Sequence, residues 1–186
     1  MSIESKIPDE ELNIKDLSGE RPEKIIVPIV EISDDDWDKL KLEESLERAR
    51  EKQDWQEFCF NAYFIKMYNP QYDLKLTQEI KDGMYAKLQT MIKEKDWMWF
   101  ATMASQMKVM NPSLLITLDQ PVLEAIGLEL QKIKQDKNQT SYNMLYNSAI
   151  VLLSKKVVLK RSGLELEPPD AFGQSILKDL PITRKF

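Results

Sequence analysis

Two stretches, DWQEFCFNAYFIKMYNP at residues 54–70 and DWMWFATMASQMKVMNP at residues 96–112, align at a shift of 42 residues. Seven of the seventeen aligned positions are identical: Asp54, Trp55, Phe58, Ala62, Lys66, Asn69 and Pro70 in the first copy. A third, weaker copy follows at a shift of 45, and its matching residues are Ser141, Tyr142, Leu145, Ala149 and Leu152. Self-similarity at a fixed period of this length indicates a repeat architecture.

Each copy predicts a capped amphipathic helix. Asp54, Asp96 and Ser141 are good N-cap residues because their side-chain oxygens accept from the free N–H groups of a first helical turn. Large apolar residues then recur every three or four positions, which is one face of a helix. The first two copies end in Asn–Pro, and proline disfavours helix at the residue before it, so we expect these helices to stop at Asn69 and Asn111.

A second helix precedes each copy. Its predicted caps are Asp35, Thr77 and Asp119. Its apolar positions repeat as Leu42/Met84/Ile126, Leu46/Leu88/Leu130, Ala49/Met91/Ile133 and Ile80/Val122. The unit is therefore a helical hairpin, and residues 34–161 hold three of them, at about 34–70, 77–112 and 119–161.

The predicted fold class is all-α. One hairpin leaves an apolar face in water, so consecutive hairpins must stack and share a core. The period of about 42 residues resembles that of HEAT and armadillo repeats. A short α-solenoid and a compact six-helix bundle both satisfy this pattern. Residues 162–186 are expected to cap the domain, with a short helix over 170–180 that Pro181 stops.

Residues 1–33 lack a helical period and predict an extended, acidic N-terminal arm. Within it, residues 25–32 are rich in β-branched side chains, which favours an extended backbone. This stretch either packs along the protein's own helices or adds to a partner's surface or sheet edge. Its candidate partner-binding residues are Ile25, Ile26, Val27 and Ile29.

The charge distribution is uneven along the chain. Residues 1–57 carry 9 basic and 18 acidic side chains, whereas residues 150–186 carry 7 basic and 4 acidic ones. Such asymmetry suggests head-to-tail contact or separate partners for the two ends, and solvated faces without a partner give the same pattern.

The composition excludes many kinds of catalytic site. The chain has no histidine, a single cysteine and five scattered glycines, so it can form neither a His-dependent nucleophile pair nor a four-cysteine metal site nor a glycine-rich phosphate loop. No apolar run approaches the roughly 18 residues of a membrane-spanning helix. We therefore expect a cytoplasmic protein that is not an enzyme and has no metal, no cofactor and no small-molecule substrate.

The remaining candidate residues are aromatic or basic. Trp55 and Phe58 lie on the repeating face and predict core packing. Phe60, Phe64 and Trp99 lie off that face and are candidates for a partner-binding surface. The basic candidates are Lys155, Lys156, Lys160 and Arg161, and Phe186 closes a basic tail that could dock on a partner. The basic run either contacts phosphate or acidic protein, or complements the negative end of a helix.

The sequence thus predicts a non-enzymatic helical-repeat adaptor or assembly subunit in a larger intracellular or viral complex. Its partners would be other proteins or further copies of the same chain. The alternative is a nucleic-acid-associated accessory protein that uses residues 155–161 and the C-terminal tail. Four cations are few for a phosphate-binding footprint in a chain with a pI near 5.0, so protein partners are preferred.

Overall fold

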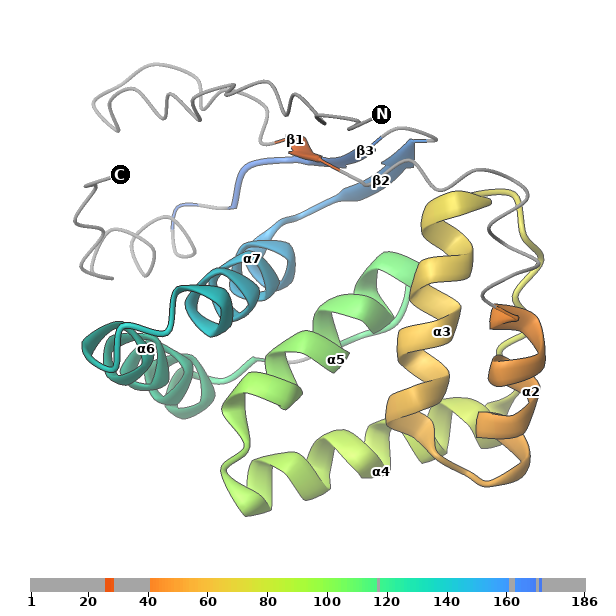
Figure 1. Ribbon diagram of the computed structural model, residues 1–186, viewed down its shortest axis with the longest axis horizontal. Helices are drawn as coiled ribbons and strands as arrows, with labels where there is room; N and C mark the ends of the chain where they lie inside the picture. Colours follow the sequence, from red (N-terminus) through yellow and green to blue (C-terminus); the bar gives the residue numbers. More distant parts are fainter. Residues whose placement is uncertain (1–25, 29–40, 117, 161–162, 170, 172–186) are drawn as a thin grey trace, which may run out of the picture.

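The structure is a computed structural model that describes residues 26–28, 41–116, 118–160, 163–169 and 171 (Figure 1). Within these residues the chain is mostly helical, as the sequence predicts. The elements are β1 (Ile26–Pro28), α2 (Leu42–Glu51), α3 (Trp55–Tyr68), α4 (Gln78–Glu94), α5 (Trp97–Met110), α6 (Gln120–Gln135), α7 (Gln139–Leu153), β2 (Val157–Lys160) and β3 (Gly163–Leu166).

One turn geometry joins the two helices of each hairpin. Its central residue has a left-handed backbone, with φ of 56° at Gln53, 58° at Lys95 and 57° at Lys137. The following N–H donates to the carbonyl five residues earlier, from Asp54 to Ala49 at 2.8 Å, Asp96 to Met91 at 2.9 Å and Asn138 to Ile133 at 3.2 Å. This is the Schellman ending of a helix. The three turns lie 42 residues apart, so residues separated by 42 are compared below as equivalent positions relative to these turns.

Four predicted N-caps are confirmed. The side chains of Asp54 and Asp96 accept from the backbone N–H three residues later at 3.0 and 3.3 Å. Thr77 and Asp119 do the same at 3.3 and 3.1 Å. The helix α2 begins at Leu42, later than a cap at Asp35 predicts, and Asp35 itself lies outside the described residues.

The predicted cap of the third copy is wrong. Asn138, not Ser141, caps α7, and its Oδ1 accepts the N–H of Ser141 at 3.1 Å. The third copy therefore follows the second at 42 residues instead of 45. The error arose because apolar residues recur at both three and four positions along a helix face, so that a slip of three residues still aligns them. The turn, which has one register, decides between the two alignments.

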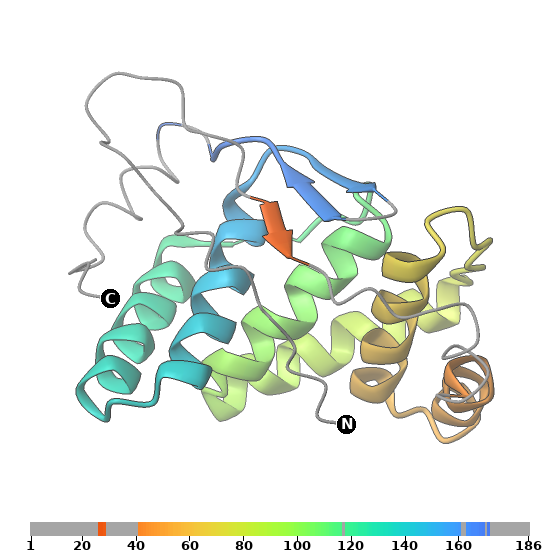
Figure 2. The same cartoon turned by 45° about the horizontal axis from the view of Figure 1, so that its top comes forward.

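The helix core lies where the sequence places it. Every predicted repeat position of the first helices is buried, as are Phe58, Ala62, Phe100 and Ala104 of the second helices. Helix α5 lies between α3 and α7 and packs against both (Figures 1 and 2). The first helix of each hairpin packs against its own second helix, and α4 and α6 also contact the second helix of the preceding hairpin. The three hairpins therefore share one continuous core.

Gly83 gives α4 its close approach to α3. A Cβ built at Gly83 would lie 2.2 Å from the indole ring of Trp55. Only a residue without a side chain fits beneath that ring, which stays partly buried against the core.

A three-stranded antiparallel sheet, in the order β1-β3-β2, adds to the all-α expectation. Figure 2 shows the sheet against the row of helices that α3, α5 and α7 form. Three residues of the sheet join Met67, Val109 and Val151 in a second apolar cluster. These three side chains are equivalent positions of α3, α5 and α7. The sheet thus covers the carboxyl-terminal ends of all three helices. Its residues in the cluster are Val157, Leu164 and Leu166.

The last helix ends earlier than predicted. Helix α7 stops at Leu153, and the chain then forms β2 and β3 where the sequence suggested the end of a helical unit near residue 161. Val157 and Val158 are β-branched and pair with Leu166 and Glu165 across the sheet. Strand β1 also contains β-branched residues, Ile26 and Val27, which pair with Glu165 and Leu164 of β3.

Candidate functional site

Three aromatic side chains, one per helical turn, form a continuous strip on α3. We call Phe60, Phe64 and Tyr68 the α3 aromatic face. The ring centroids of Phe60 and Phe64 are 4.7 Å apart, and those of Phe64 and Tyr68 are 6.2 Å apart with nearly parallel planes. Phe60 is 46% exposed, and the other two are half-buried. The first two rings are residues that the sequence analysis placed off the core face.

The same positions are buried on the neighbouring helix. In α5 they are Thr102, Gln106 and Met110, all of which are buried. In α7 they are Met144, Ser148 and Leu152, of which the last two are buried. The α3 aromatic face is therefore the side of the helix whose counterpart in α5 is buried at all three positions.

The opposite end of the row has a different chemistry. On the side that would face a following helix, α7 carries Asn143 and Asn147, and both are exposed. The equivalent residues of α5, Ala101 and Ser105, are buried. The outer side of α7 thus carries amide side chains, which can form hydrogen bonds with water. The outer side of α3 carries aromatic rings instead.

A buried polar atom lies beside the α3 aromatic face. Asn61 is 5% exposed, and its Nδ2 has no hydrogen-bond partner among the described residues. The equivalent residues of α5 and α7 are Met103 and Leu145, which are fully buried and apolar. Asn61 precedes Phe64 by three residues, so it lies on the adjoining side of the same helix. A buried donor without an acceptor is unusual, since it loses its bonds to water without replacement.

Trp99 stands apart from this face. It lies in the first turn of α5, where its backbone N–H donates to Asp96, and its side chain is 38% exposed. Among the described residues its ring makes no contact with the rings of Phe60 and Phe64. The structure thus brings Phe60 and Phe64 together and leaves Trp99 separate.

The basic run begins directly after the C-cap residue of α7, Ser154, and continues into β2. Lys155 and Lys156 follow the end of α7 and are exposed, and Lys156 Nζ lies 3.7 Å from Glu167. Lys160 ends β2, and Arg161 lies outside the described residues. A further cation at the carboxyl-terminal end of α7 is Lys108, whose Nζ donates to the carbonyls of Leu152, at 2.8 Å, and Ser154. Only packing of α5 beside α7 brings that lysine there, which the sequence does not reveal.

The arm candidates divide between the sheet and the undescribed termini. Ile26 and Val27 lie in β1, whose backbone pairs with β3 of the same chain. Ile25, Ile29 and Phe186 lie outside the described residues, as do most of the predicted N-terminal arm and of the predicted helix over 170–180.

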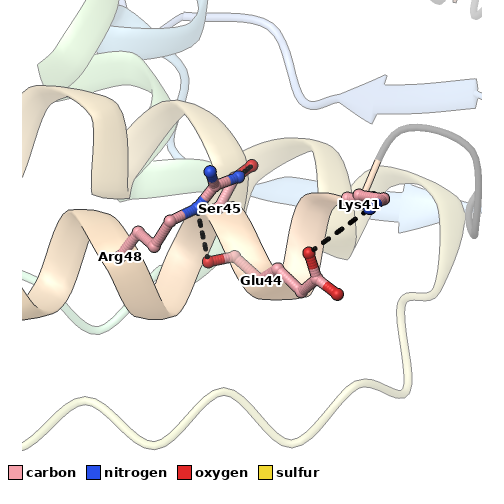
Figure 3. A network of polar contacts seen from close by, with 4 residues as sticks. All are labelled: Lys41, Glu44, Ser45 and Arg48. Carbon is pink, nitrogen blue, oxygen red and sulfur yellow. Dashed lines mark hydrogen bonds and ion pairs between the residues drawn. The ribbon is translucent and has the colours of Figure 1, made fainter.

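The exposed side of α2 is a charged helix surface. Arg48 donates to Ser45 Oγ at 3.0 Å and to the carbonyl of Glu44 at 3.4 Å, and Lys41 lies 4.0 Å from the Glu44 carboxylate (Figure 3). These are local contacts within one helical turn, and exposed pairs of this kind contribute little to stability. They do not converge on a common point.

Reactive groups do not converge elsewhere in the described chain. Burial raises the pKa of the Cys59 thiol, which is therefore protonated and enclosed between helices. No group of three Cys, Asp or Glu side chains in the described ranges could hold a metal ion. None of the described helices is both long and apolar enough to span a membrane.

Comparisons with known proteins add no relationship: no protein-family model, no curated protein and no solved structure matches this chain. The α3 aromatic face, with Asn61 beside it, is accordingly identified from its own geometry as the candidate functional site.

Proposed function

We propose that this protein is a non-enzymatic helical-repeat adaptor or assembly subunit that binds another protein through the α3 aromatic face. In this proposal the three hairpins form one short array whose successive second helices stack side by side. The recurrence of one turn every 42 residues and the position of α5 between α3 and α7 support it.

The observation that carries the proposal is the contrast between equivalent positions. Positions that are buried in α5 are aromatic and partly exposed in α3. End repeats of helical arrays normally present a polar outer face, and α7 does so with Asn143 and Asn147. Aromatic residues are enriched among the side chains that dominate binding energy at protein interfaces.

Asn61 supports the same surface independently. Its Nδ2 is enclosed, so a carbonyl or carboxylate oxygen of the partner would satisfy it only if neighbouring side chains move on binding. Leaving such a donor without an acceptor costs roughly 1–3 kcal/mol, which binding would recover. The proposed partner surface is therefore apolar, with one hydrogen-bond acceptor beside the ring of Phe64.

The test uses the full chain as bait and compares two edge variants. Phe60→Ser with Phe64→Ser removes two rings, and Asn143→Ser with Asn147→Ser is the matched control at the opposite edge. We expect the first variant to lose a specifically captured partner, or the self-association seen by light scattering, by at least about tenfold, because interface aromatic residues contribute about 1.4 kcal/mol or more each. The control should retain it.

Two results would contradict the proposal. One is capture or self-association that both variants retain, and the other is a wild-type chain that stays monomeric and captures nothing. Circular dichroism of both variants must show the wild-type helical signal, so that loss of binding reports the surface and not the fold. Charge reversal of Lys155 and Lys156 is a further variant. Loss of binding in that variant alone would show that the partner binds the basic run and not the α3 aromatic face.

A further inference from the structure

The β2–β3 hairpin forms a cover that is separate from the core of the helices. Its inward side chains Val157, Leu164 and Leu166 belong to the second apolar cluster, whereas the core that the helices share contains no described residue of β2 or β3. The helices also contact one another directly. Their packing therefore does not depend on the hairpin.

The hairpin is held together by its own backbone. All four residues of β2 pair with β3. The same register continues outward through the bond that Glu167 N–H donates to the carbonyl of Lys156 at 3.0 Å, and through the bridge between Ser154 and Pro169. These pairs stay intact if the hairpin moves away from the helices, so it can move as one unit from its first residue, Ser154.

One charged contact fixes this first residue to the helices. Lys108 of α5 reaches the end of α7, where its Nζ donates to the carbonyl of Leu152 at 2.8 Å and to the carbonyl of Ser154. We call these two bonds the Lys108 contact. The last turn of α7 carries no basic residue of its own. A cation is favoured at this place because the last carbonyls of a helix lack helical partners and form its negative end.

The equivalent lysine of α3 has different partners. Lys66 Nζ donates to the carbonyls of Pro70 at 3.0 Å and Tyr72 at 2.7 Å, in the chain that leaves its own helix. The equivalent residue of α7 is Ile150, which has no side-chain donor. The start of the β2–β3 hairpin therefore depends on a lysine of the preceding helical hairpin.

We propose that the positive charge of Lys108 holds the β2–β3 hairpin closed on the helices, and that the hairpin opens as one unit when the Lys108 contact is lost. Opening uncovers Met67, Val109 and Val151, which the sheet covers in the closed structure. Met67 directly precedes Tyr68, so the uncovered apolar surface adjoins the α3 aromatic face. The opening itself does not require a partner at that face.

Hydrogen exchange of backbone amides, measured by mass spectrometry on the full chain, tests the Lys108 contact. Lys108→Met keeps an aliphatic side chain and removes the charge. We expect the amides of β2 and β3 to exchange about tenfold faster, which corresponds to about 1.4 kcal/mol of opening free energy, because the lost bonds are charge-assisted. The amides of α4 should exchange at the wild-type rate, since the helices share a separate core.

Lys66→Met is the matched control, because it removes the same charge at the equivalent position of α3. It should leave exchange in β2 and β3 unchanged. Unchanged exchange of these strands in Lys108→Met, or equal acceleration in both lysine variants, would overturn the proposal. Acceleration that extends through α4 would overturn it as well, since Lys108 would then support the whole fold.

A second variant tests whether the hairpin opens as one unit. Leu164 is 3% exposed, and Leu164→Ala weakens the apolar contact of β3 with the helices while leaving Lys108 unchanged. It should accelerate exchange in β2 as much as in β3 and retain the helical signal in circular dichroism. Acceleration confined to β3 would contradict opening as one unit.

Discussion

At the scale of single residues, the candidate site depends on differences between equivalent positions, and these were only partly predictable. The sequence placed Phe60 and Phe64 off the core face because they break the repeating apolar pattern. It gave no reason to single out Asn61, since one asparagine in a helix is normally a surface residue. The available signal was that Met103 and Leu145 stand at the equivalent positions. The wrong alignment of the third copy hid the comparison with Leu145.

Replacing Asn61 with methionine, the residue at the equivalent position of α5, should stabilise the isolated chain. The change removes a buried donor that has no acceptor and adds apolar surface to a buried position. We expect the free energy of unfolding to rise by about 1 kcal/mol, measured by urea denaturation followed by circular dichroism. Asn61→Ala is the control, because it also removes the donor but leaves a cavity. A decrease in stability for the methionine variant would show that Nδ2 is satisfied in the folded chain.

At the scale of elements, the turn between paired helices determines the register of the repeat. Each turn places a glutamine or lysine in the left-handed region, where a side chain is strained. The sequence showed the caps on either side but not this conformation, because glycine, the usual residue for it, is absent from all three turns. Helix caps therefore predicted the start of both helices only in the second hairpin, and apolar spacing misplaced the second helix of the third.

Glycine at the central turn position should stabilise each hairpin. Lys95→Gly relieves the left-handed strain at φ 58°, and the gain exceeds the greater entropy of glycine in the unfolded chain. The expected increase in the free energy of unfolding is about 0.5–1 kcal/mol by thermal or urea denaturation. Lys93→Gly, two residues earlier within α4, is the matched control and should destabilise by about 1 kcal/mol. Equal effects of the two substitutions would refute the role of the turn.

At the scale of the whole molecule, the sheet joins the second helices of all three hairpins. The cluster that contains Met67, Val109 and Val151 is closed by β2 and β3, and β1 pairs with the outer edge of β3. The two ends of the row then differ. An aromatic surface remains at α3, and exposed amide side chains lie on α7.

A chain that lacks residues 1–28 should keep its helices but lose the strand that covers β3. The helices contact one another directly and share their own apolar core, so the far-ultraviolet helical signal should be unchanged. The uncovered edge of β3 exposes unpaired backbone groups and should increase self-association, which light scattering measures. The full chain at the same concentration is the reference. Loss of the helical signal on truncation would show that β1 is needed for folding.

The sequence by itself determined the helical hairpins, four of their caps and the apolar positions of the core, because these depend on local spacing and on side chains within one turn. Tertiary structure alone decided the register of the third hairpin, the three-stranded sheet and the contact of Lys108 with the end of α7. It also decided which aromatic residues are covered. Those features depend on which segments lie side by side, and the pairing of distant segments is not encoded in the periodicity of any one of them.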